Sequence, residues 1–191
     1  YIYGSVLPRS LFSIESDFVE QNPTLVRPYQ EGMMLCEDEI KLFTNDKAGK
    51  AGRASWYVVQ KTVIKTGLDY LYRWKVVVSS ANAGGQKRSN QIAVLDNRSA
   101  FGRSRVALKT FDTEKEARNF YTYCQTDFIR YAFLLTDEAL TSLGKLVPDL
   151  LDYTDDNGII DYAQDVNAQL YRLFGIDESM QAIIKKTLSE R

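Results

Sequence analysis

The order of two hydrophobic patterns along the chain places the strongest constraint on its fold. Short runs rich in aromatic and β-branched residues, the composition typical of strands, come first, at residues 56–59, 74–78, 91–95 and 106–108. From Thr113 onward, apolar residues recur at helical spacing instead. Strands followed by helices predict an α+β fold, in which a twisted mixed or antiparallel sheet with long polar loops precedes a C-terminal group of helices.

One long amphipathic helix is predicted after the last strand. Thr113 and Glu116 have the spacing of a capping box, which satisfies backbone N–H groups at a helix start. We expect one apolar face to pack against the sheet. That face consists of Ala117, Phe120, Tyr121, Cys124, Phe128, Tyr131, Ala132 and Leu135. A further helix is expected from about Glu138, and two short helices are expected on either side of Gly175.

The length of 191 residues allows one large domain, or one domain with a small satellite. Residues 1–46 have weak periodicity and contain three prolines, so we expect a lead-in segment that packs on the domain. The main domain is then expected to span residues 47–191, with its sheet in residues 56–110 and its helical part in residues 113–189. Residues 1–5 contain neither an initiator Met nor a signal sequence, so we interpret the chain as a fragment of a larger enzyme.

The charged residues are sorted by position. Residues 47–109 hold thirteen Lys and Arg and two acids, a net charge of +11, whereas the rest holds 11 Lys and Arg and 23 acids, a net charge of −12. We call residues 47–109 the basic segment. Clustered cations attract a polyanion by releasing its counterions, so the pattern predicts nucleic acid as the partner. The alternative is a solvated basic face on an ordinary domain.

Several kinds of chemistry are excluded. The sequence contains no histidine, which excludes imidazole catalysis and His metal sites. Its glycines match neither the P-loop nor the dinucleotide spacing. With Gly158 at the sixth position of a calcium loop, Tyr153 and Gln164 would stand where carboxylates are required. No metal site is therefore predicted, and no apolar run approaches the roughly 18 residues of a membrane helix.

The two cysteines form no close pair in the sequence. We expect Cys36 and Cys124 to be reduced residues in or near the core, rather than a disulfide or a metal site. Reduced cysteines are typical of cytoplasmic proteins, which gives a cytoplasmic location as the expectation.

Four groups of residues occur in an order that resembles one enzyme family. They are WKVVVSSAN at 74–82, FDTEKEARNF at 111–120 with TDFIR at 126–130, VPD at 147–149, and LYRLFGI at 170–176. Together they resemble the C-terminal target recognition domain of adenine-specific DNA methyltransferases of type II restriction-modification systems, including methylase-nuclease fusions. The resemblance covers roughly residues 56–188. It implies a domain that grips double-stranded DNA beside a Rossmann-like catalytic domain of the same polypeptide, where S-adenosylmethionine and the flipped adenine are held.

That catalytic domain is not expected in this chain. Family members hold the target base with an Asn-Pro-Pro-Tyr motif or a close relative, whereas residues 22–25 read Asn-Pro-Thr-Leu and lack the aromatic that would stack on an extruded base. No glycine-rich motif for the methyl donor follows a strand near the start. We therefore expect that the chain alone binds no cofactor and is not an enzyme.

The expected DNA contacts divide by physical role. Cations that contact phosphates add affinity without sequence information, and the candidates are Lys47, Lys50, Arg53, Lys75, Lys87 and Arg98. Arg pairs with guanine and Asn or Gln with adenine, so the base-reading candidates are Gln86, Arg88, Ser89, Asn90, Gln91, Arg103 and Arg105. The connection at residues 97–105 can either read bases or hold the backbone, and its sequence does not decide between the two roles.

Two alternative functions remain. Glu39-Ile40-Lys41 has the Glu-x-Lys spacing of metal-dependent nucleases, with Asp17 or Asp38 as the second carboxylate, although no strand and helix frame is predicted around it. Glu-x-Lys also arises as a charged surface stretch. A protein-interaction module would instead use the acidic helical region.

Overall fold

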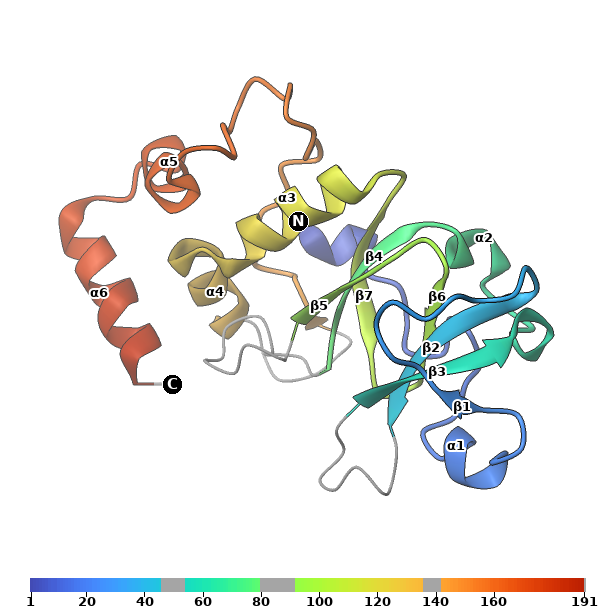
Figure 1. Ribbon diagram of the computed structural model, residues 1–191. Helices are drawn as coiled ribbons and strands as arrows, with labels where there is room; N and C mark the ends of the chain where they lie inside the picture. The colour runs from blue at the N-terminus through green and yellow to red at the C-terminus, as the bar shows by residue number, and fades with distance from the viewer. Residues whose placement is uncertain (46–53, 80–91, 136–141, 191) are drawn as a thin grey trace.

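The strands of this protein form two separate sheets. The computed structural model describes residues 1–45, 54–79, 92–135 and 142–190 (Figure 1). A four-stranded sheet has the order β1-β3-β2-β6, and a three-stranded sheet has the order β5-β4-β7. The helices lie toward the C-terminus, so the predicted α+β fold is confirmed.

The four-stranded sheet is built mainly on a hairpin. β2 (Glu39–Asn45) and β3 (Ala54–Gln60) are antiparallel over their full length, from the pair Glu39 and Gln60 to the pair Asn45 and Ala54. β1 (Arg27–Pro28) adds to the outer side of β3, and β6 (Ser99–Phe101) runs parallel to β2. The predicted run at residues 56–59 therefore lies in β3, whereas β1, β2 and β6 were not predicted.

The three-stranded sheet contains the other predicted strands. β4 (Trp74–Val78) lies between β5 (Ile92–Leu95) and β7 (Val106–Phe111), and both pairings are antiparallel. Val78, the last residue of β4, is paired with both Ile92 and Val106. β4 has the predicted bounds, and β7 continues three residues past its predicted end.

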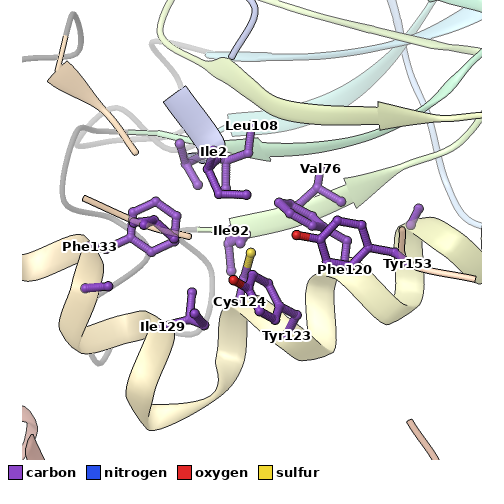
Figure 2. Close-up of a cluster of buried hydrophobic side chains, with 14 of the residues drawn as sticks. Ile2, Val76, Ile92, Leu108, Phe120, Tyr123, Cys124, Ile129, Phe133 and Tyr153 are labelled. Carbon is purple, nitrogen blue, oxygen red and sulfur yellow. The ribbon is translucent and has the colours of Figure 1, made fainter. Parts of the chain in front are cut away.

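Two hydrophobic cores lie on the two faces of the three-stranded sheet. Because side chains alternate along a strand, Val77 faces one core while Val76 and Val78 face the other. The first core lies between the sheets and consists of Phe12, Ile14, Ile40, Leu42, Tyr57, Val59, Ile64, Leu71, Val77, Leu95, Ala100, Phe101 and Ala107. The second lies between the three-stranded sheet and the helices, and Figure 2 shows Phe120, Tyr123 and Phe133 in it.

Residues 1–45 belong structurally to both cores. Ile2, in the 3-10 helix η1 (Ile2–Ser5), is fully buried in the core beneath the helices. Phe12 and Ile14 are buried between the sheets, and β2 is a central strand. Three further short elements complete this half of the chain: α1 (Phe18–Gln21), η2 (Lys61–Val63) and α2 (Leu68–Leu71).

The predicted long helix is two helices. α3 (Glu114–Gln125) begins at the predicted cap, where the Thr113 side chain accepts from the Glu116 N–H. Thr126 has extended backbone angles, and its hydroxyl caps α4 (Asp127–Leu134) by accepting from the Ile129 N–H. This break rotates the apolar face, so Leu135 is 54% exposed while Ile129 and Phe133 are buried.

The C-terminal helices α5 (Val166–Leu173) and α6 (Glu178–Ser189) lie on either side of Gly175, as predicted. Gly175 has a positive φ of 64°, which suits a residue that ends a helix, and the Asp177 side chain caps α6. Glu138 lies outside the described residues, and residues 142–165 contain no α-helix, so the helix expected there is absent from that range.

The two cysteines differ in exposure. Both are free; Cys124 is fully buried in the core beneath the helices, as expected, and burial raises the pKa of its thiol well above the usual value. Cys36 is exposed, so the expectation of a near-core position was wrong for this residue.

Candidate nucleic-acid interface

Three connections leave the two sheets from neighbouring strand ends. The chain leaves β2 after Asn45 and re-enters at Ala54, and it leaves β4 after Val78 and re-enters near Ile92. The third connection, residues 102–105, joins β6 to β7. Its Arg105 precedes Val106, the partner of Val78, and donates from Nη1 to Asn45 Oδ1 at 3.3 Å. In Figure 1 the ends of β2 and β4 lie on the same, lower side of the sheets.

These three connections are rich in cations. Residues 46–53, 80–91 and 102–105 hold seven Lys and Arg and one acid, Asp46. The seven cations are Lys47, Lys50, Arg53, Lys87, Arg88, Arg103 and Arg105. We call the described part of this region, Asn45, Ala54, Val78, Ile92 and residues 102–106, the basic end of the sheets.

Most of the predicted contact residues lie outside the described residues. They are the phosphate candidates Lys47, Lys50, Arg53 and Lys87 and the base-reading candidates Gln86, Arg88, Ser89, Asn90 and Gln91. The structure locates the strand ends to which their segments connect.

Lys75 is not available to a phosphate. Its side chain is fully buried in β4, and its Nζ donates to the carbonyl oxygens of Leu71 at 3.1 Å, Arg73 at 2.6 Å and Asp96 at 3.1 Å. Burial lowers the pKa of Lys75 to about 7. The assignment of Lys75 to phosphate binding was therefore wrong, because its ammonium group holds segments of this protein together instead.

Arg105 does not fit a base-reading role either. The residue is only 7% exposed, its Nη1 also donates to Ser104 Oγ at 2.9 Å, and its guanidinium lies 4.8 Å from the centre of the Phe43 ring. Burial lowers the pKa of Arg105. A guanidinium held in this way cannot form a bidentate pair with guanine unless it first gives up these contacts.

Arg98 and Arg103 differ in how firmly other groups of this protein hold their guanidinium groups. Arg98 Nε donates to the Glu39 carbonyl oxygen at 2.9 Å and Nη2 donates to that of Cys36, so its guanidinium braces residues 36–39 rather than standing free for a phosphate. Arg103 Nη1 lies 3.4 Å from Glu15 Oε1, and its side chain is 39% exposed. An exposed ion pair of this kind is weak and can be exchanged for another anion.

Other cations of the basic segment are paired with acids from elsewhere in the chain. Lys109 Nζ lies 2.6 Å from Asp149 Oδ2, and Arg73 forms an ion pair with Asp112. Lys61 and Lys65 are exposed, and they follow the C-terminal end of β3, which is the end opposite Ala54. Within the described residues, the cations of the strands are therefore used mainly inside the protein.

An aromatic group that the sequence analysis did not identify lies beside the basic end. The Trp56 ring centre is 4.8 Å from that of Phe43 and 6.2 Å from that of Tyr29. Lys41 Nζ lies over two of these rings, 5.2 Å from the centre of Tyr29 and 5.5 Å from that of Trp56. Together with Arg105 over Phe43, these contacts join β2, β3 and the residue after β1. The alternation of β2, with Ile40 and Leu42 inward, was the available signal.

Both charged side chains of the Glu-x-Lys triplet are paired with other groups of this protein. Glu39 and Lys41 lie in β2, contrary to the expectation that no strand frames them. The Glu39 carboxylate accepts from the Cys36 N–H at 2.8 Å and pairs with Arg27 at 3.0 Å, and the Cys36 bond is the main cause that lowers its pKa. Lys41 is paired with Asp96. The described residues contain no group of three His, Cys, Asp or Glu that could hold a metal ion.

Comparisons of the chain with protein-family models, with curated proteins and with solved structures give no match. Among the described residues, no helix has both the length and the apolar character needed to cross a membrane.

Proposed function

We propose that this chain binds double-stranded DNA through the basic end of the sheets and the two connections that leave it. The observation that carries the proposal is that the strand ends from which three cation-rich segments depart lie close together. They come from different sheets and are far apart in the sequence, yet Arg105 joins the end of β2 to the start of β7. Loops carried on a rigid sheet are common positions for binding residues.

The proposal assigns the DNA contacts to connections rather than to strands. Lys75 and Arg105 are buried, Arg98 is bound to backbone carbonyls, and Lys109 and Arg73 are paired with carboxylates. Phosphate contacts are then left to Lys47, Lys50, Arg53 and Lys87, and base reading to residues 86, 88–91 and Arg103. The phosphate contacts supply affinity without sequence information, and the base contacts supply discrimination.

The resemblance of the sequence extends this proposal to a biological role. We propose that the chain is the target recognition domain of an adenine-specific DNA methyltransferase of a cytoplasmic restriction-modification system. In that role it positions DNA for a catalytic domain of the same polypeptide, which would bind S-adenosylmethionine. Purified polypeptide that includes the flanking sequence is expected to methylate adenine within one short sequence, mapped by sequencing; absence of adenine methylation would remove the role while leaving DNA binding to be judged separately.

DNA binding itself is tested by a salt titration. Fluorescence anisotropy of a labelled mixed-sequence duplex would give the association constant of the chain at several salt concentrations. The variant Lys47→Ala/Lys50→Ala/Arg53→Ala is expected to bind more weakly and to flatten the salt slope by about 2 to 3, at roughly 0.9 per lost phosphate contact.

The matched control is Lys61→Ala/Lys65→Ala, which removes exposed cations of the same segment at the far end of β3. It is expected to bind like the parent chain. Binding that does not depend on salt, or an equal loss in the control, would contradict the proposed interface.

A further inference from the structure

Arg105 is a buried cation whose side-chain contacts with the described residues are all to neutral groups. Its guanidinium contacts the Asn45 side-chain oxygen, the Ser104 hydroxyl and the Phe43 ring, and only 7% of the residue is exposed. Removing a charge from water without a strong counter-charge is unfavourable. An uncharged side chain would fill this position without the free energy of desolvating a charge, so packing alone does not explain why an arginine is here.

The position of Arg105 supplies that reason. Asn45 is the last described residue of β2 before the chain leaves the sheet, and it is paired with Ala54, where the chain returns. Val106, next to Arg105, is paired with Val78, which in turn is paired with Ile92. Arg105 therefore connects the loop end of the β2–β3 hairpin to the loop end of the β4–β5 hairpin, although the two hairpins belong to different sheets.

The turn that carries Arg105 is itself fixed on β2. The Gly102 N–H donates to the Phe43 carbonyl at 3.0 Å, and the Arg105 N–H donates to the Gly102 carbonyl at 3.1 Å. A Cβ atom at Gly102 would lie only 2.0 Å from Thr44 Oγ1, so the turn approaches β2 as closely as a glycine allows. Arg105 is thus held by its backbone as well as by its side chain.

We propose that Arg105 is a positioning residue for DNA binding, which sets the distance between the strand ends at Asn45 and Val78 from which the two cation-rich segments depart. This inference rests on the proposed function. It replaces the base-reading role predicted from the sequence, and it makes Asn45, an uncharged residue, equally necessary.

The first test separates positioning from direct contact. Arg105→Lys keeps the charge and loses the planar fork, whereas Asn45→Ala keeps the fork and loses its acceptor. Each is expected to weaken binding to the mixed-sequence duplex about tenfold, and the double variant is expected to bind no more weakly than either single variant. Direct contact by Arg105 predicts instead near-normal binding by Asn45→Ala, which keeps the guanidinium, and that result would overturn the proposal.

The second test needs no DNA. Hydrogen exchange in the free protein is expected to become faster at the amides of residues 43–45 and 54–56 in Arg105→Lys and in Asn45→Ala, because the hairpin end loses its link to β7. Arg103→Lys, in the same turn but partly exposed, is the control and is expected to exchange like the parent chain. Unchanged exchange in both variants would refute the coupling, even if the parent chain binds DNA. A parent chain that does not bind DNA would instead refute the proposed function.

Discussion

The buried Lys75 predicts that the stability of this protein rises with pH through the neutral range. Its Nζ is surrounded by three backbone carbonyls, with the Asp96 carboxylate acting to raise its pKa and Arg73 and Lys41 acting to lower it. Burial is the largest of these effects and lowers the pKa to about 7, from 10.5 in a solvated lysine. Between these two values the unfolded chain binds a proton that the folded protein does not, so raising the pH favours the folded state.

The magnitude follows from the pKa values. The free energy of unfolding is expected to rise by up to about 1.4 kcal/mol per pH unit in this window, which amounts to about 2 kcal/mol between about pH 6.5 and 8.5. At higher pH the Cys124 thiol opposes the rise, because burial raises its pKa and the unfolded chain then loses a proton that the folded protein keeps. The measurement is therefore best confined to the range below about pH 8.5.

The variant Lys75→Met isolates this effect. Methionine matches the unbranched stem, removes the titrating group and leaves three carbonyls without their donor, a loss of about 1 to 3 kcal/mol. Urea denaturation followed by tryptophan fluorescence at several pH values is expected to show that the deficit of the variant grows by about 2 kcal/mol from pH 6.5 to 8.5. Lys65→Met, at an exposed site, is the control and is expected to parallel the parent chain. A constant deficit would refute the reasoning, since it would mean that the carbonyls and Asp96 keep Lys75 charged throughout.

Three further predictions concern the helices, the second core and the connections. Thr126→Ala removes the cap of α4 and is expected to lower the free energy of unfolding by about 1 kcal/mol in thermal or urea unfolding, whereas Thr126→Ser is expected to preserve it. Tyr153→Phe leaves Asp149 Oδ1 and the Leu150 N–H without a shared partner, and a loss of about 1 to 3 kcal/mol is expected by the same measurement; an unchanged midpoint would contradict the role of the hydroxyl. Arg88→Ala is expected to reduce the preference for the cognate over a random duplex by about 1 to 3 kcal/mol, whereas Lys50→Ala is expected to weaken both equally and flatten the salt slope by about 1. Equal losses on both duplexes for Arg88→Ala would remove it from the base-reading group.

The strands and helices that the sequence predicted well are those whose signals are local. β4 has the predicted bounds because Trp74 and the three valines at 76–78 are residues that favour strands. α3 begins after Thr113, as predicted, because a capping box is recognised from the spacing of two nearby residues. The break at Thr126 was also a local signal, since Thr-Asp is a common helix start. It was missed because apolar residues on both sides of it fit one continuous helical period.

β2 was missed because two of its seven residues are charged. Lys41, Phe43 and Asn45 are partly exposed and alternate with buried residues, as expected of a strand with one face on the core, but Glu39 and Lys41 suggested a surface stretch. The division of the strands into two sheets could not be predicted, since it depends on which strands pair at long range. Lys75 was misassigned for a related reason: two of its carbonyl partners, Leu71 and Arg73, are local, but the third, Asp96, reaches it only through the pairing of β4 with β5.

The separation of charge along the sequence is partly cancelled in space. Arg73, Lys109 and Arg103 belong to the basic segment, and each pairs with an acid from the acidic remainder of the chain, namely Asp112, Asp149 and Glu15. The net charge of +11 therefore overstates the charge that a polyanion would meet. We expect a duplex at the basic end to contact at most the seven cations of the three connections.

The number of cations in the three connections limits the expected salt dependence of DNA binding. If all thirteen cations of the basic segment contacted phosphates, the slope of log association constant against log salt would approach about −12, at roughly −0.9 per contact. Seven connection cations limit it to about −6, and a slope shallower still is expected if Arg105 positions the others without touching a phosphate. A measured slope much steeper than about −6 would show that strand cations such as Lys109 leave their carboxylates to bind DNA, and the division between structural and binding cations would then be wrong. A slope within the limit, flattened by about 2 to 3 in the Lys47→Ala/Lys50→Ala/Arg53→Ala variant and unchanged in Lys61→Ala/Lys65→Ala, would support that division.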